Sequence, residues 1–367
     1  MNRLWSTFSA LTSIDSVSFE EREFCDELKR RLQDLGIETY EDNVGDKLGG
    51  NCGNLFGFLP GELPQPPLLL SAHMDTVEPG RGKQPTLQDE DRIISAGDTV
   101  LGADDVAGIA IILEALTRLK ESNTAFRPVE LVFPVAEERY CLGSAHGEMS
   151  RITAKEGYIL DLAGTIGEAA NAAPTLLSFT ITVRGKAAHA GFAPTDGIHA
   201  IQAAAKAIAK TPLGEPELGV TVNLGVIEGG KATNIVPEEC RVVGEIRSLS
   251  HEKVMNQWQS MQDTFVSEVE AMGATVSFRE NIEVTAFETP LDAPVVTRFQ
   301  KVCEALDIPA NIAPTLGASD QNNFALHGVQ GLVVACSMHE VHSTRESTRL
   351  SEMEQCVKLL MRLLTED

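Results

Sequence analysis

Basic residues are scarce in this chain. Of its 367 residues, 30 are Lys or Arg and 53 are Asp or Glu, which gives a formal net charge of −23 and a pI near 4.7. A surface this acidic repels phosphate backbones and anionic lipids. We therefore expect no nucleic acid and no membrane among its partners.

Long apolar runs and paired cysteines are also missing from the sequence. No apolar stretch is long enough to cross a bilayer, and residues 1–14 make a poor signal peptide because Ser and Thr interrupt their apolar part. The seven cysteines include no Cys-x-x-Cys pair, which argues against a zinc knuckle and for free thiols in a reducing compartment. These features predict a cytoplasmic protein.

The length of the chain favours two domains, because one hydrophobic core rarely serves so many residues. Strands and helices alternate up to residue 173, which predicts an α/β domain with a mostly parallel central sheet flanked by helices. The polar stretch Arg81–Asp91 is expected to be a loop within it. From Ala173 to about Glu283 the predicted order is β-α-β-β-α-β, that of a ferredoxin-like unit. We predict a catalytic domain of residues 1–173 and 284–367, with residues 174–283 inserted as a lid.

The chain is organised around the segment Ser71–Val77, which follows a predicted buried strand at Leu68–Leu70. Ligands of open α/β sheets bind at the carboxyl ends of the strands, where His73 and Asp75 fall. A histidine can ligate a metal through one ring nitrogen while a nearby carboxylate holds the ring. The alternative is a lone histidine beside a surface aspartate, and this motif alone does not decide between the two.

Carboxylates mark further predicted strand and helix ends. Asp104 and Asp105 stand at the entry of a predicted helix, where one of them could act as a cap. A cap does not explain the second carboxylate, which repels the first unless a cation offsets the charge. Two adjacent glutamates, Glu137 and Glu138, end the apolar strand that begins at Val129.

Two more candidates complete this pattern. Asp161 follows the predicted strand Gly157–Leu160, and His342 lies in Val341–Glu346, just before the last helix. Two histidines with several carboxylates suit zinc, cobalt or manganese, and a bridging carboxylate suits a two-metal site. Such a pair of metals can share a water, lower its pKa and polarise a carbonyl group.

In this order and spacing, the segments HMDTV, LGADDVAG, AEE and VHSTRE, with Asp161, resemble the di-zinc exopeptidase family of peptidase T, carboxypeptidase G and the aminoacylases. The glutamate loop and the LGADDVAG segment look most like the peptidase T branch. The resemblance implies a di-zinc hydrolase whose inserted lid also dimerises in many members. It implies that His73 and Asp161 hold one metal, that Glu138 and His342 hold the other, and that Asp104 bridges the two. It also implies that Glu137 is the general base and that Asp75 is the carboxylate that supports a metal-binding histidine from behind.

Three lid positions match functional residues of the family. His189 lies in a loop of small residues after a strand and corresponds to a histidine that stabilises the oxyanion. Asn234 and Arg247 resemble substrate-binding residues, and a guanidinium suits a bidentate grip on a carboxylate. His339 is the other candidate for the metal ligand assigned to His342. Only His342 is followed by the residues that the family pattern has after its histidine.

The leading hypothesis is an aminopeptidase that acts on short peptides, of the tripeptide type, with two divalent metal ions, zinc in the first place. An N-acyl amino acid deacylase or a carboxypeptidase of the same family is the alternative, in which Arg247 would face the substrate carboxylate. A non-catalytic binding protein is the third. The sequence differs from the family pattern at Val106 and at the pair Arg139-Tyr140. We expect these differences to affect the choice of substrate more than the binding of metal. We expect a short peptide substrate and a homodimer formed through the lid.

Overall fold

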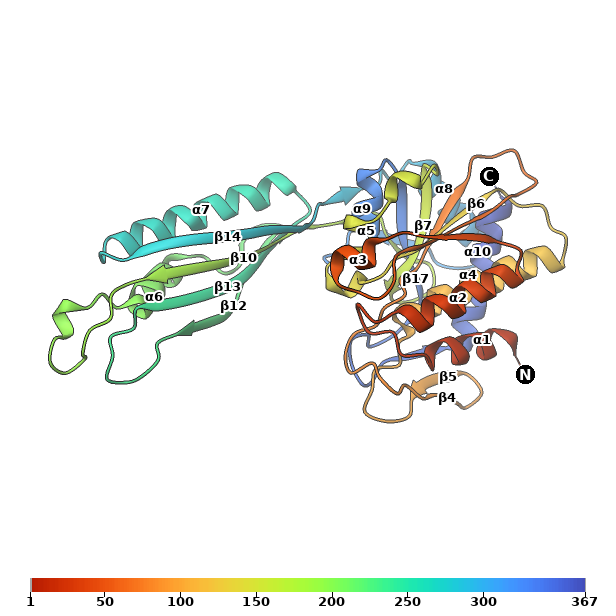
Figure 1. Ribbon diagram of the computed structural model, residues 1–367. Helices are drawn as coiled ribbons and strands as arrows, with labels where there is room; N and C mark the ends of the chain where they lie inside the picture. Colours follow the sequence, from red (N-terminus) through yellow and green to blue (C-terminus); the bar gives the residue numbers. More distant parts are fainter. Residues whose placement is uncertain (1, 367) are drawn as a thin grey trace. The chain divides into compact units, whose positions relative to one another are not determined.

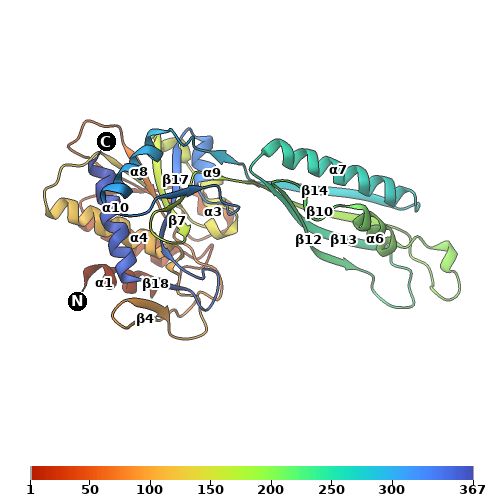
Figure 2. The ribbon, with the colours of Figure 1, turned by 180° about the vertical axis from the view of Figure 1, so that it is seen from behind.

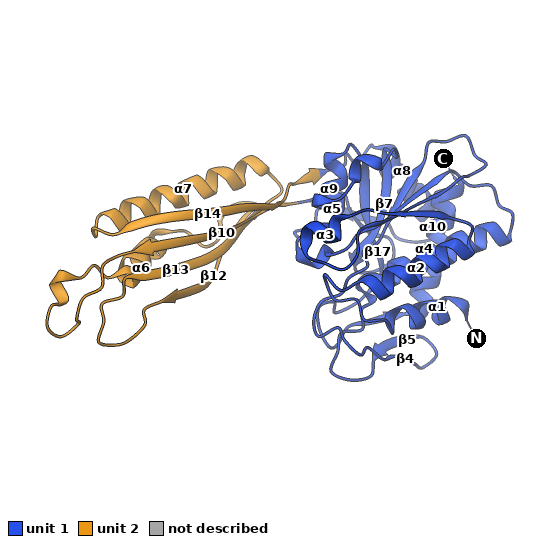
Figure 3. Ribbon diagram, viewed as in Figure 1, with its two compact units in different colours: residues 1–173, 288–367 blue, residues 174–287 orange. Residues whose placement is uncertain are grey.

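The computed structural model describes residues 2–366 (Figure 1). It divides into two compact units, one of residues 1–173 and 288–367 and the other of residues 174–287 (Figure 3). The predicted lid ended at residue 283. Residues 284–287 lie with the second unit because its last strand continues to Val284, beyond the predicted strand Ala274–Arg279.

The first unit is built on an eight-stranded sheet with the order β1-β2-β6-β3-β7-β17-β8-β16. Its central strands β6, β3, β7 and β17 run parallel, while β1, β2 and β6 pair antiparallel at one edge. This arrangement confirms the predicted mostly parallel core. The strands are β1 (Glu38–Glu41), β2 (Leu55–Leu59), β3 (Leu68–Ser71), β6 (Val129–Phe133), β7 (Glu156–Ala163), β8 (Glu168–Ala170), β16 (Asn311–Ala313) and β17 (Gln330–Met338).

Helix α4 (Ala103–Glu121) crosses the centre of this unit, where it packs against β7, β17 and a second helix, α10 (Leu350–Thr365) (Figure 2). It is apolar nearly all round, as a helix buried on every side must be. The buried carboxylate of Glu114, in the middle of this helix, is neutralised by Arg3 and Arg118 at 2.8 and 2.6 Å. The other helices are α1 (Arg3–Thr12), α2 (Arg22–Asp34), α3 (Val44–Leu48), α5 (Leu142–His146), α8 (Pro294–Ala305) and α9 (Gln321–Leu326).

The stretch predicted as a loop at Arg81–Asp91 contains a strand, so that prediction is wrong in part. β4 (Pro85–Gln88) pairs with β5 (Arg92–Ser95), which in turn pairs with β18 (Ser347–Arg349). β18 comes from the far end of the chain, so no local sequence pattern reveals this pairing. Within residues 2–366, no helix combines the length and apolar character that crossing a bilayer requires.

The second unit is the predicted ferredoxin-like insertion. Two helices pack together against a sheet of order β11-β12-β13-β10-β14, in which β11 is an edge strand additional to the predicted pattern (Figure 1). Alternating buried residues of β10 face the helices, as the period of two along a strand requires. Its elements are β10 (Thr175–Arg184), α6 (Ala200–Lys210), β11 (Gly214–Glu217), β12 (Val220–Gly229), β13 (Glu239–Ser248), α7 (His251–Glu270) and β14 (Thr275–Val284).

Candidate active site

The carboxyl ends of the parallel strands meet at one edge of the sheet, and the predicted site residues follow them. His73 comes just after β3, Glu137 and Glu138 lie in a 3-10 turn after β6, and His342 comes after β17. Asp161 lies within β7, which runs to Ala163 rather than ending before it as predicted. The strand ends therefore place these side chains around one point.

The ring of His73 is buried and fixed from behind. Its Nδ1 lies 2.9 Å from the backbone carbonyl oxygen of Asp75, which can only accept, so Nδ1 carries the proton. Nε2 then offers its lone pair to the opposite side, where Asp104 Oδ1 lies at 3.0 Å and Asp161 Oδ1 at 3.8 Å. This is the orientation of a histidine prepared to ligate a metal.

The carboxylate of Asp104 lies between two histidines. Oδ1 is 3.0 Å from His73 Nε2, and Oδ2 is 3.3 Å from His342 Nε2. His342 Nε2 also lies 3.0 Å from the carboxylate of Glu138. The donor atoms of His73, Asp104 and Glu138 lie close together, and so do those of His73, Glu137 and Asp161. His342 adds a ring nitrogen to the first of these two groups through its contacts with Asp104 and Glu138. Imidazole nitrogens and carboxylate oxygens in these two groups fit a pair of divalent cations.

Asp105 turns away from this centre. Its carboxylate accepts hydrogen bonds from the backbone N–H groups of His73, at 3.1 Å, and of Gly108, at 3.3 Å. The sequence left open whether the two aspartates cap a helix or crowd around a cation. The structure divides these roles, because Asp105 serves the backbone at the start of α4 while Asp104 faces the histidines.

Burial and mutual repulsion dominate the electrostatics of the site. Burial raises the pKa of Glu137 well above its usual value, and the nearby charge of Asp161 raises it further. Burial also raises the pKa of Asp104, but hydrogen bonds with His342 and His73 outweigh it and hold this pKa well below normal. Hydrogen bonds with Asp104 first and Glu138 second raise the pKa of His342 to about 11. So dense a group of buried acids is a favourable place for cations.

Asp75 holds the turn that carries the two glutamates. Its buried carboxylate accepts the backbone N–H of Glu137 at 2.8 Å and of Glu138 at 3.2 Å, and the hydroxyl of Ser18 at 2.7 Å. Asp75 Oδ1 lies 3.5 Å from His73 Nδ1, whereas the backbone carbonyl oxygen of Asp75 lies 2.9 Å from the same nitrogen. The carboxylate that the resemblance placed behind the histidine therefore contacts the glutamate turn most closely.

Glu346 supports the Asp104 loop in the same manner. Its buried carboxylate accepts the backbone N–H groups of Gly102 at 2.7 Å and of Asp104 at 2.9 Å. In the sequence it stood out only as part of the VHSTRE motif, and its backbone contacts have no local signal because they join segments far apart in the chain.

We expect the substitution Glu346→Ala to weaken metal binding by roughly 10–100-fold, because groups that orient a ligand contribute about this much. Calorimetric titration with zinc measures the change. Glu340→Ala is the matched control, since Glu340 lies on the same loop, half exposed, and pairs with Arg345. Equal zinc affinity in Glu346→Ala and the parent protein would contradict the role of Glu346.

His339, the rival of His342, faces elsewhere. Its Nε2 lies 2.6 Å from Glu352 Oε2, on α10, so the structure brings His342 and not His339 to the carboxylates. Asp320 stands at the N-terminus of α9, but its side chain makes no capping hydrogen bond there. Its buried carboxylate accepts the hydroxyl of Ser144 at 2.5 Å.

In the second unit, His189 and Asn234 lie in neighbouring loops, joined by the hydrogen bond from Ala190 N to the carbonyl oxygen of Asn234 at 3.0 Å. His189 Nδ1 accepts the backbone N–H groups of Gly191 and Phe192, both at 3.1 Å. The proton of a neutral ring therefore sits on Nε2, which leaves an exposed hydrogen-bond donor. The imidazole also stacks on Phe192, with 4.3 Å between ring centroids.

Arg247 is separated from these two residues. It lies opposite Leu176, near the start of β10, whereas His189 follows the end of β10 at Arg184. At about 3.3 Å per residue the strand between these points is roughly 26 Å long. The guanidinium already forms two contacts with Glu245, at 2.8 and 3.2 Å. Within one chain, the second unit therefore does not bring its three candidate residues close enough together to contact a single short peptide.

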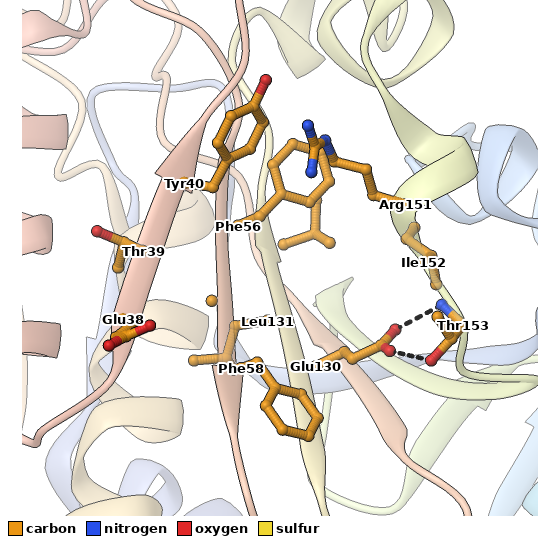
Figure 4. A pocket seen from close by; sticks show the side chains of 12 residues that line it. Glu38, Thr39, Tyr40, Phe56, Phe58, Glu130, Leu131, Arg151, Ile152 and Thr153 are labelled. Carbon is orange, nitrogen blue, oxygen red and sulfur yellow. Dashed lines mark hydrogen bonds between the residues drawn. The ribbon is translucent and has the colours of Figure 1, made fainter.

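A groove of about 500 Å³ lies away from this centre, over β1, β2 and β6 (Figure 4). The side chains of Tyr40, Phe58 and Arg151 line it, and the Arg151 guanidinium stacks over the Tyr40 ring at 3.8 Å. None of the predicted site residues belongs to this groove.

Known proteins resemble the chain in both units. Residues 54–178 match peptidase family M28, and residues 171–271 match the peptidase dimerisation domain. The uncharacterized protein YqjE of Bacillus subtilis (strain 168) is 35% identical over 364 residues, which are 99% of this chain and 98% of that protein. Peptidase T of Pectobacterium carotovorum is 23% identical over 279 residues, with 74% and 66% covered.

Two crystal structures are similar over nearly their whole length. Aminopeptidase PepT from Bacillus cereus is 36% identical with a TM-score of 0.93, and a tripeptidase from Staphylococcus aureus is 30% identical with a TM-score of 0.96. Each alignment covers 99% of this chain and 97% of the other. Fold, site and relatives together define a hydrolase of the metallopeptidase class. Within that class, the chain belongs to the family of peptidase T, as its motifs predicted.

Proposed function

We propose that this protein is an aminopeptidase that releases N-terminal residues from short peptides, of the tripeptide type, with two divalent cations. The observation that carries the proposal is the carboxylate of Asp104, whose two oxygens face two different histidines beside Glu137. The names of the two similar crystal structures, an aminopeptidase and a tripeptidase, support this substrate class.

We assign His73 and Asp161 to one cation, Glu138 and His342 to the other, and Asp104 to both. Zinc suits this donor set best, and cobalt or manganese would also fit. When bound, such a pair of cations would supply Lewis acidity, which would lower the pKa of a bound water and polarise a carbonyl oxygen.

The protein's own groups then move protons and position the substrate. Glu137 accepts the proton of the attacking water and delivers it to the leaving amine nitrogen. Asp75 holds this glutamate in place through the backbone of its turn. His189 donates its Nε2 proton in a hydrogen bond to the carbonyl oxygen as negative charge develops there. Asn234 and Arg247 bind the peptide, and Arg247 must first exchange its contact with Glu245.

A carboxypeptidase or an N-acyl amino acid deacylase is the second candidate. Several fungal relatives carry the name probable carboxypeptidase, among them one of Uncinocarpus reesii that is 29% identical over 268 residues, 64% of this chain and 59% of that protein. Such an enzyme would accept a blocked amino terminus, which an aminopeptidase rejects.

The deciding experiment combines elemental analysis of freshly purified protein with hydrolysis of trialanine, N-acetyl-trialanine and N-acetyl-alanine. We expect about two zinc-like ions per chain and cleavage of trialanine alone. Cleavage of the acetylated substrates would favour the second candidate. A protein that binds no metal and stays inactive after zinc, cobalt or manganese is added would refute both.

We further propose a cytoplasmic homodimer that forms through the second unit. The match of residues 171–271 to the peptidase dimerisation domain supports the dimer, and buried free thiols at all seven cysteines suit a reducing compartment. Light scattering on the purified protein measures the mass, which we expect to be twice that of one chain.

For His189→Ala we expect kcat to fall by about 10²–10³-fold, since loss of one oxyanion donor has this effect. Steady-state kinetics with trialanine measure the change. A fall in substrate affinity alone would exclude the oxyanion role. Mixing inactive His189→Ala with inactive Glu137→Gln subunits adds a second result: activity returns only if the histidine acts across a dimer.

A further inference from the structure

A pocket of about 400 Å³ opens beside Glu138 within the first unit. Its wall consists of Val17 and Ser18, the segment from Thr76 to Glu78, Arg81, and the pair Glu138 and Arg139. The Ser18 hydroxyl binds the Asp75 carboxylate, which also holds the turn of the two glutamates. The pocket therefore borders the candidate active site at Glu138, and its volume lies in the range of small-molecule sites.

The two arginines of this pocket differ in their surroundings. Arg81 is neutralised, because Nη1 lies 2.7 Å from Glu20 and Nε lies 3.2 Å from Glu78. The carboxylate of Glu138 is likewise occupied by His342 at 3.0 Å. Arg139 is exposed, and among residues 2–366 its guanidinium forms no ion pair and no hydrogen bond. The pocket thus holds one uncompensated positive charge, next to a residue proposed as a metal ligand.

A planar guanidinium in this position suits a carboxylate, which it can bind through two parallel hydrogen bonds. The arginine that the sequence offered for this task, Arg247, is engaged by Glu245. Arg139 is therefore the better placed of the two to receive a negative group from the substrate.

We propose that this pocket binds a carboxylate on the leaving part of the peptide and that Arg139 is its ligand. The inference rests on the proposed function and narrows its substrates to short peptides with a carboxylate shortly after the cleaved bond. The carboxylate can be the C-terminus of a tripeptide or an acidic side chain, because the same guanidinium would bind either one.

The test uses full-length, zinc-loaded Glu137→Gln protein, in which binding is measured by calorimetry without turnover. The probes are trialanine, its C-terminal amide, and the amide of Ala-Asp-Ala. We expect Arg139→Ala, added to this protein, to weaken binding of trialanine by roughly 10–100-fold, as the loss of a charged hydrogen-bond pair does, and to leave the trialanine amide unchanged. Arg139→Lys should give an intermediate value, because it keeps the charge but loses the planar fork.

The Ala-Asp-Ala amide distinguishes the two possible sources of the carboxylate, an acidic side chain and the C-terminus. Dependence of its binding on Arg139 identifies an acidic side chain, and dependence for trialanine alone identifies the C-terminus. Arg345→Ala is the matched control, an exposed arginine near His342 that is already paired with Glu340. An equal effect of Arg139→Ala on trialanine and its amide, or no effect on either, would overturn the inference.

Hydrolysis of trialanine by the parent enzyme separates this inference from the proposed function. Hydrolysis without any dependence on Arg139 leaves the aminopeptidase standing and removes the carboxylate pocket. If trialanine is not hydrolysed but its binding depends on Arg139, the carboxylate pocket stands and the proposed aminopeptidase activity is refuted.

Discussion

Glu137→Gln is expected to lower kcat for trialanine by about 10²–10⁴-fold, the range for loss of a general acid–base group. The glutamine keeps the size of the side chain and its contact with Cys141, whose thiol lies 3.2 Å from Glu137 Oε1. It cannot take up a proton from water and pass it to the leaving amine. Initial rates with trialanine, with zinc content measured on the same sample, provide the test.

The zinc content separates this prediction from a structural effect. All five residues proposed as metal ligands remain in the variant, and the glutamine keeps a side-chain oxygen in the place of Glu137, so we expect the variant to keep its metal. Glu340→Gln, at an exposed position, is the control for loss of one carboxylate charge near the site. Full activity in the Glu137→Gln variant with metal bound would exclude it as the general base.

The metal-type residues were predictable because they depend on local patterns. An apolar run followed by polar residues marks the end of a buried strand, and parallel strands bring their ends to one edge. His73 and Glu138 could be placed together on this basis before any contact was known. The ferredoxin-like insertion was predictable for a related reason, since periods of two and of 3.6 distinguish its strands from its helices.

The contacts that hold these residues were not predictable, because they join distant segments or depend on the exact backbone path. Which of two adjacent aspartates faces the histidines depends on the irregular backbone of Asp104 and Asp105 at the entry of α4. Glu346 reaches the same loop from the far end of the chain. The pairing of Arg247 with Glu245 did have a signal, since residues two apart in a strand share a face.

Asp104 is the residue whose loss should affect both metals at once. The substitution Asp104→Ala removes a carboxylate whose two oxygens lie 3.0 Å from His73 Nε2 and 3.3 Å from His342 Nε2, whereas Asp161→Ala removes a ligand of one group only. We therefore expect Asp104→Ala to lose both ions and its activity, and Asp161→Ala to keep one. Elemental analysis after dialysis against the same zinc buffer measures the difference, with Glu340→Ala as the control.

Thermal stability gives a second reading of the Asp104 prediction. A ligand present at 100 times its dissociation constant stabilises the folded state by about 2.7 kcal/mol, so a chelator should lower the Tm of the parent protein. In Asp104→Ala the chelator should leave Tm unchanged, because no ion is there to be removed. A variant that still contains two ions, or whose Tm still falls with chelator, would show that Asp104 does not bridge them. The two metal groups would then be held independently, one through His73 and the other through His342.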